Sequence, residues 1–209
     1  MQRKSDIIDA AETEFFDNIY DEVLMEDIAK NAELSKGTLY TYFKNKQSLY
    51  FAVVIRGMIL LRDTFKNASE NKNTGLEKIT AIIHSFHEYI QNYSNYYQLN
   101  LSSRDRRFTN MLDNKEIDSA NEYISLVMDL LNLLKNPVIL GLKDGTLRQD
   151  LDPIQTVMFL GSAIESAVYV SPENQMLLDQ TKITKEQYVK HSIDVLLKGI
   201  SREKSKKVY

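Results

Sequence analysis

Residues 34–46 constrain the fold of this chain more than any other stretch. They read Leu-Ser-Lys-Gly-Thr-Leu-Tyr-Thr-Tyr-Phe-Lys-Asn-Lys. Ser35 is a residue type that caps helices, because its hydroxyl accepts a hydrogen bond from a free backbone N–H of the first turn. Leu39 and Phe43 are four residues apart and share one face, while lysine, threonine and tyrosine side chains cover the rest. A helix of about two turns is too short to be stable alone. The stretch therefore predicts a short helix that lies on a scaffold and presents a polar face.

The preceding residues supply that scaffold. Residues 25–32 predict a second short helix, whose apolar positions recur at helical spacing: Met25, Ile28, Ala29 and Ala32. Glu33 and Leu34 then make a tight connection into the helix capped by Ser35. Two helices joined by a turn of three to four residues form a helix-turn-helix, whose second helix enters the major groove of DNA.

This pattern resembles the DNA-binding domain of the tetracycline-repressor (TetR) family over about the first 55 residues. Many separate positions agree in order: Ile8 to Ala11, Phe15, Tyr20, Asp27 to Ala29, Ala32, Ser35 to Tyr40, Tyr42, Phe43, Lys46, Leu49, Ala52 and Val53. The resemblance implies an all-α protein with about nine helices. It predicts an N-terminal helix-turn-helix domain over residues 1–48 and a helical effector-binding and dimerisation domain over residues 49–209.

The resemblance also implies which residues contact DNA. The short helix uses its positions on bases and phosphates, and the start of the next helix holds a phosphate. These positions are Ser35, Lys36, Gly37, Thr38, Tyr40, Tyr42 and Lys46. Gly37 permits close approach because it has no side chain. The alternative is an ordinary solvated polar face, but exposed paired tyrosines flanked by lysines are better explained by contacts to the DNA backbone.

The sequence departs from the family pattern at four residues. Ile19 replaces a glycine before the aromatic residue that follows the first helix, and Val23 and Leu24 replace the usual threonine or serine cap. Asp21 is the alternative cap. Glu33 replaces the glycine of the turn, where a left-handed backbone costs a non-glycine residue roughly 1 kcal/mol. These changes weaken the expected geometry without touching the recognition residues.

Composition supports a helical globular protein in a reducing compartment. A hydrophobic fraction of 43% favours a real core, while only 7 Gly and 3 Pro disfavour a turn-rich β fold. There is no Cys, which excludes disulfides and thiolate metal sites. No signal peptide and no membrane-spanning run is evident, so we expect a cytoplasmic protein without a membrane partner.

The net charge of −3 does not by itself suggest a nucleic-acid binder. Residues 1–50 hold six Lys/Arg against ten Asp/Glu. However, residues 34–62 contain five basic residues and no acidic one. Phosphate binding depends on the local charge rather than on the total charge. The acids of the first helix, Asp9, Glu12 and Glu14, are therefore expected on its solvent- or domain-facing sides.

The rest of the chain continues in helices. Asn45 is expected to cap a long helix to about residue 68, residues 67–75 form a polar break, and a helix over 115–135 is expected to break or kink at Pro137. The residues from Asp144 to Pro153 loosely resemble the segment before the family's dimer helices. This implies a homodimer through residues 154–170 and 184–200, paired as a four-helix bundle. Independently, the near-total apolarity of 154–170 requires cover on two sides. The alternative is a helix buried inside one subunit.

An effector site is the least defined feature. Aromatic and methionine side chains suit adaptable ligand cavities, and the candidates are Phe86, His87, Tyr97, Met111, Met128 and Glu165. Core packing is the default explanation for each of them. His84 and His87 are three residues apart, but no accompanying ligand motif supports a metal site. No cofactor is expected.

Catalytic motifs are absent, since the sequence has no phosphate-binding glycine loop, nucleophile elbow or paired histidine and carboxylate motif. The sequence therefore predicts a homodimeric transcriptional regulator, most simply a repressor, that binds double-stranded DNA at a near-palindromic operator. The half-sites are expected about 34–36 Å, or a multiple, apart. A small-molecule effector would release it. The alternatives are a helical interaction protein, or a ligand carrier, whose helix-turn-helix no longer binds DNA.

Overall fold

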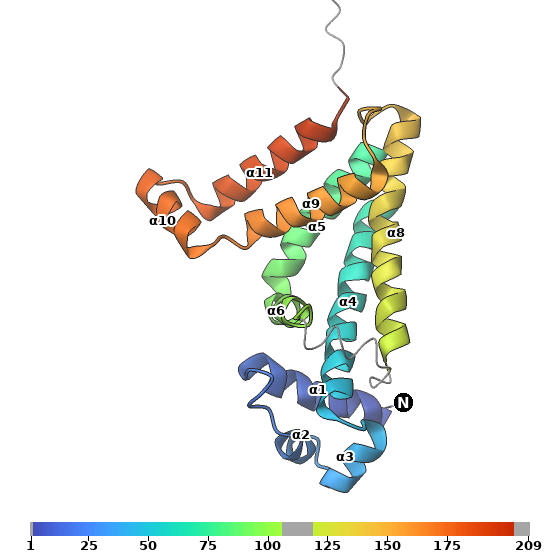
Figure 1. Cartoon of the computed structure of the whole chain (residues 1–209), viewed down its shortest axis with the longest axis vertical. Helices are drawn as coiled ribbons and strands as arrows, with labels where there is room; N and C mark the ends of the chain where they lie inside the picture. Colours follow the sequence, from blue (N-terminus) through green and yellow to red (C-terminus); the bar gives the residue numbers. More distant parts are fainter. Residues whose placement is uncertain (1, 106–118, 203–209) are drawn as a thin grey trace, which may run out of the picture. The chain divides into compact units, whose positions relative to one another are not determined.

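The computed structural model describes residues 2–105 and 119–202, and these residues are helical with short connections (Figure 1). Ten helices lie in the described part: α1 (Gln2–Asp17), α2 (Met25–Asn31), α3 (Lys36–Tyr42), α4 (Lys46–Glu70), α5 (Gly75–Asn92), α6 (Ser94–Ser102), α8 (Ala120–Asp144), α9 (Pro153–Val168), α10 (Pro172–Thr181) and α11 (Lys185–Ile200). The all-α prediction is confirmed.

Close contacts divide the chain into two compact units that are not continuous in sequence. The first unit combines Met1–Leu61 with Asn92–Met128, and the second combines Arg62–Gln91 with Asp129–Tyr209. Helices α4 and α8 each contribute residues to both units. The expected functional division between residues 48 and 49 is a separate matter and stays a prediction.

The N-terminal head, α1 to α3 with the start of α4, is built around a small apolar core. Its helices contribute residues that are 3% exposed or less: Ile7, Ala11 and Phe15 from α1, Ile28 and Ala29 from α2, Leu39 from α3, and Leu49 and Tyr50 from α4. The rings of Phe15, Tyr20 and Tyr50 contact one another at centroid distances of 5.1 to 6.1 Å. The amphipathic spacing seen in the sequence therefore places the recognition helix on this core.

The predicted caps at the starts of α3 and α4 are confirmed. The Ser35 hydroxyl accepts a hydrogen bond from Thr38 N at 3.1 Å, and the Asn45 side chain accepts one from Ser48 N at 2.8 Å. Glu33 has a φ of 55°, so the turn between α2 and α3 is left-handed as expected. Leu24 begins α2 without a side-chain cap.

We expect Glu33→Gly to raise the free energy of unfolding. Glycine removes roughly 1–2 kcal/mol of left-handed strain, while its greater freedom in the unfolded chain offsets about 0.5–1 kcal/mol. The net gain is about 0.5–1 kcal/mol, measurable by urea unfolding. Glu33→Ala removes the same charge but keeps the strain. An equal gain in Glu33→Ala would show that charge, rather than backbone conformation, is responsible.

Helix α6 contacts the head through a set of polar side chains. Glu12 Oε1 accepts from Arg56 Nη1 at 2.6 Å and from the Tyr96 hydroxyl at 2.5 Å, and Arg56 also donates to Asp9 at 2.5 Å. Burial, and then the hydrogen bond to Glu12, raise the pKa of Tyr96. A Cβ on Gly57 would lie 2.7 Å from the Tyr96 ring, so the glycine leaves room for that ring on α4.

The second unit has its own core between α5, α8, α9 and α11. The buried residues of this core are Ile79, Ile83, Val138, Leu147, Val157, Leu160, Ile164, Val168, Val189, Ile193 and Ile200. Helices α5 and α8 cross very closely, because a Cβ on Gly75 would lie 2.1 Å from Gly141 N. Asp144 Oδ2 accepts from Gly75 N at 2.8 Å, and Asp144 Oδ1 accepts from Thr146 N at 2.9 Å. The last residue of α8 therefore caps the start of α5.

Two details of the second unit differ from expectation. Helix α8 continues through Pro137 to Asp144 instead of breaking there. Packing explains this continuation, because Val138 is fully buried and α5 lies against this turn. Helix α10 was not expected, although Ser171 caps it and Pro172 begins it. By length and hydropathy α8 is the one described helix that could cross a membrane, a test that core helices of soluble proteins also pass.

Stability should fall with acid through Asp144. Desolvation raises the pKa of this carboxyl, but hydrogen bonds from Thr146 and Gly75 outweigh it, so the folded-state pKa lies below its ordinary value. A carboxylate with a depressed pKa stabilises the fold above the unfolded-state pKa of about 3.9. That contribution is lost as the pH falls through the lower, folded-state value.

We therefore expect Asp144→Asn to destabilise the protein at pH 7 and to flatten the fall in stability below about pH 4. Urea midpoints measured from pH 7 to pH 3 test this. Asp17→Asn, at the exposed end of α1, is the control for removing one carboxylate. If both variants keep the native pH profile, the Asp144 contacts do not contribute as argued.

Candidate nucleic-acid interface

The recognition helix α3 presents its polar residues outward and buries only Leu39. Ser35, Lys36 and Gly37 are exposed, and Tyr40 and Tyr42 are 41% and 42% exposed. Thr38 is partly covered, and its hydroxyl lies 2.8 Å from the Ser35 hydroxyl. A Cβ on Gly37 would meet nothing nearer than Ser35 Oγ at 3.9 Å. The structure thus brings six of the predicted residues onto one open surface, the α3 face: Ser35, Lys36, Gly37, Thr38, Tyr40 and Tyr42.

Lys36 is paired within the head. Its ammonium donates to a carboxylate oxygen of Glu26 on α2, and both side chains are more than half exposed. Hydrogen bonding and charge attraction raise the pKa of Lys36 and lower that of Glu26. Solvent-exposed pairs of this kind contribute little to stability. A DNA phosphate that binds Lys36 would therefore compete with Glu26 at small cost to the fold.

Lys46 is placed differently from the other six residues. Its ammonium donates to the carbonyl oxygens of Tyr20 at 2.8 Å, Val23 at 2.9 Å and Asp21 at 3.4 Å. It also lies 4.5 Å from the centroid of the Tyr20 ring. An ammonium has three donors, so these carbonyls use its full capacity in the absence of DNA.

Three acids of α1 contact neighbouring helices. Asp9 and Glu12 bind Arg56, and Glu14 accepts from the side chain of Asn31 at 2.7 Å. Arg56, which belongs to the basic stretch of residues 34–62, is therefore paired with two acids of α1. The head has more acidic than basic residues, but Asp9, Glu12 and Glu14 do not lie on the α3 face.

The six candidate effector residues are not brought into one cavity among the described residues. Tyr97 is buried and Met128 is 51% exposed in the first unit, while Phe86, His87 and Glu165 are partly buried in the second unit. Phe86 packs against Phe65 with ring centroids 5.9 Å apart, and His87 contacts Gln91. Met111 lies outside the described residues. The effector assignments stay predictions.

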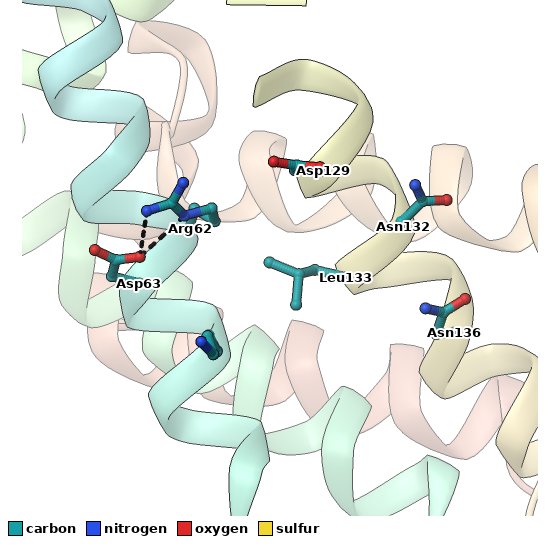
Figure 2. A pocket seen from close by; sticks show the side chains of 7 residues that line it. Arg62, Asp63, Asp129, Asn132, Leu133 and Asn136 are labelled. Atoms are coloured by element: carbon teal, nitrogen blue, oxygen red, sulfur yellow. Dashed lines mark hydrogen bonds and ion pairs between the residues drawn. The ribbon is translucent and has the colours of Figure 1, made fainter. Parts of the chain in front are cut away.

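A polar cleft of about 480 Å³ lies between α4 and α8 in the second unit (Figure 2). Its lining residues are Arg62, Asp63, Lys66, Asp129, Asn132, Leu133 and Asn136. Arg62 Nη2 is 2.8 Å from Asp63 Oδ1. Sequence analysis did not identify this cleft, but the polar residues at helical spacing on the otherwise apolar α8 were a usable signal. Within residues 2–105 and 119–202, no cluster of His, Asp and Glu suits a metal ion.

Helices α9 and α11 pack against each other and leave an apolar surface open. On this surface, the α9/α11 face, Ile154, Met158 and Phe159 are 41%, 66% and 61% exposed, and Val195 is 52% exposed. Gly161 and Gly199 also lie open, since a Cβ on either would meet nothing within 4 Å. Exposed apolar residues beside bare glycines suit close packing against another helical surface.

Comparisons with known proteins agree with the geometry of the head. Residues 7–53 match the family described as bacterial regulatory proteins, tetR family. The HTH-type transcriptional activator FasR of Mycolicibacterium smegmatis is 30% identical over 98 residues, which cover 47% of this chain and 45% of FasR, about half of its length. The fatty acid metabolism regulator protein of Bacillus subtilis is 24% identical over 148 residues, covering 70% of this chain and 71% of that protein.

Likeness to a solved structure extends over nearly the whole chain. The crystal structure of the transcriptional regulator FadR from Bacillus subtilis, in complex with stearoyl-CoA, has a TM-score of 0.69. Its sequence identity is 22%, over 94% of this chain and 98% of that one, which shows a shared fold. Residues 7–53, which hold the helix-turn-helix, therefore match the tetR family of bacterial regulatory proteins, and the chain as a whole shares the fold of this FadR.

Proposed function

We propose that this chain is a homodimeric, cytoplasmic transcriptional regulator that binds operator DNA through α3 and is controlled by an acyl-thioester effector. The observation that carries the DNA-binding role is the α3 face, where Lys36, Tyr40 and Tyr42 are exposed on a helix held rigidly by its cap and core. None of these three side chains is buried in the core of the head. A helix of this size with exposed donors fits the major groove.

The residues of the α3 face have distinct roles in this proposal. Lys36 leaves Glu26 to bind a phosphate or a guanine edge, and the Tyr40 and Tyr42 hydroxyls donate to phosphates. Gly37 lets the start of the helix approach the DNA backbone, where the helix dipole and the N–H groups near Ser35 favour negative charge. Thr38 is held by Ser35 and stands beside them.

Dimerisation through the α9/α11 face would place two copies of α3 on one side of the duplex. Matching two grooves requires half-sites about one helical turn apart, or a multiple of it. The predicted segments 154–170 and 184–200 correspond to α9 and α11, with α9 ending at Val168. An effector that binds the second unit would change the population of dimers with the required spacing.

The chemical class of the effector is inferred from the relatives. A FadR of the same fold was solved with stearoyl-CoA, and the Bacillus subtilis relative is a regulator of fatty acid metabolism. A long-chain acyl-CoA is therefore the first effector to test. We expect the protein to release its DNA when the effector binds, which is the response of a repressor. Since FasR is described as an activator, stronger DNA binding with the effector is the outcome that would reverse this sign.

The test is a selection of bound fragments from sheared genomic DNA. The native protein should enrich an inverted repeat, whereas Lys36→Ala/Tyr40→Ala should bind it at least about 100-fold more weakly, from roughly 1–3 kcal/mol per lost contact. Lys72→Ala, an exposed lysine of the second unit, is the matched control. Stearoyl-CoA should then release the native protein, and free coenzyme A should not.

If a folded native dimer enriches no sequence at moderate salt, with or without stearoyl-CoA, the DNA-binding proposal is wrong. Enrichment without any response to acyl-CoA would retain the DNA-binding role and reject the effector class. Tight binding of stearoyl-CoA without DNA binding would instead identify a ligand carrier.

A further inference from the structure

Lys46, the first residue of α4, is partly buried and donates to main-chain carbonyl groups. Lys46 Nζ lies 2.8 and 2.9 Å from the carbonyl oxygens of Tyr20 and Val23, 3.4 Å from that of Asp21, and over the Tyr20 ring. Hydrogen bonds from an ammonium to carbonyls are stronger than those between neutral groups. A phosphate would have to displace three oxygen partners to bind this side chain.

The segment that supplies these carbonyls leads into α2 without a side-chain cap. Helix α2 begins after Leu24, whose backbone is extended and whose side chain is 56% exposed and offers no cap. Val23 is buried, but its carbonyl points to Lys46. Serine, threonine, aspartate or asparagine normally caps such a helix. Leu24 occupies that position, next to the Val23 carbonyl that Lys46 binds.

We propose that Lys46 is a positioning residue rather than a phosphate ligand. Its ammonium joins the start of α4 to the connection between α1 and α2. This contact takes the place of the missing cap and fixes where α2 begins. It thereby sets the orientation of α3. The effect on DNA binding rests on the proposed function. The contact of Lys46 with the three carbonyls, here called the Lys46 clamp, does not. Lysine suits this task because a compact charge on a long stem can meet three converging carbonyls, whereas the planar guanidinium of arginine cannot.

Two single variants separate the two roles. Lys46→Met keeps most of the stem but removes the ammonium, and should lower Tm by roughly 4–8 °C. Lys36→Met, on the exposed α3 face, should leave Tm nearly unchanged. Binding to a generic duplex of about 30 base pairs is then measured across a salt series.

The salt dependence distinguishes a clamp from a phosphate contact. Each phosphate contact contributes about 0.9 to the slope of log K against log salt, so losing one per subunit flattens a dimer's slope by about two. Lys36→Met should show this flattening. Lys46→Met should bind about tenfold more weakly with an unchanged slope.

Rescue by a cap tests the positional role directly. Leu24→Thr supplies a side-chain cap, which typically contributes about 1 kcal/mol, and should restore part of the Tm lost in Lys46→Met. An unchanged Tm with a flattened slope in Lys46→Met would overturn the proposal, as would a cap that gives no rescue. If the native protein binds no DNA, the thermal measurements and the rescue still decide whether the clamp exists.

Discussion

Replacing Gly75 with alanine is expected to destabilise the protein by at least about 3 kcal/mol. The added Cβ would lie 2.1 Å from Gly141 N, 2.3 Å from Gly141 Cα and 2.4 Å from the Pro137 carbonyl oxygen. All three atoms are backbone, so no side-chain rotation can relieve the overlap. Helices α5 and α8 would have to separate, which also breaks the bond between Gly75 N and Asp144.

Thermal and urea unfolding measure this effect, and Tm should fall by roughly 6–12 °C for a chain of this size. Gly37→Ala is the matched control, because its Cβ would meet only Ser35 Oγ at 3.9 Å. We expect it to raise stability by no more than about 1 kcal/mol and to weaken DNA binding. Equal thermal stability of Gly75→Ala and the native protein would mean that the helices do not cross so closely.

Phe159→Glu is expected to convert the dimer into a monomer. Phe159 is 61% exposed beside Met158 on α9, and α11 packs next to it with Val195 also exposed. In the proposed dimer these side chains would be desolvated against the same face of the partner. A carboxylate placed there twice by symmetry would weaken association at least about 100-fold, given roughly 2 kcal/mol or more per central interface residue.

Sedimentation at micromolar concentration tests this result. Ile19→Glu is the matched control, because Ile19 is 65% exposed in the head and lies outside the α9/α11 face. The Phe159→Glu monomer should keep its helical content but lose affinity for an inverted repeat, since each head then binds its half-site alone. A native protein that sediments as a monomer, or a Phe159→Glu variant that stays dimeric, would exclude this face as the interface.

Local order was predictable where each residue's partner is near in sequence. The Ser35 cap and the left-handed turn at Glu33 were both expected from residues within a few positions of one another. The amphipathic spacing of Leu39 and Phe43 likewise predicted which side of α3 would be buried. Short-range periodicity and capping chemistry determine such features directly.

The residues missed by sequence analysis have partners that are far apart in the chain. Lys46 follows the pattern of a phosphate ligand, yet its ammonium is bound by carbonyls more than twenty residues earlier. Arg56 was counted as part of a basic face, but α1 neutralises it. Every residue has a main-chain carbonyl group, so the sequence does not show which carbonyl will bind a lysine. Which charged side chains pair depends on how the helices cross.

The sequence alone therefore determined the helical class, the helix-turn-helix and the set of residues on the α3 face, because these follow from local spacing and residue type. Only the tertiary structure decided that α8 continues through Pro137, that Gly75 and Asp144 join α5 to α8, and that Lys46 faces inward. The physical reason is that packing and long-range hydrogen bonds outweigh the local preferences of a proline or an isolated lysine.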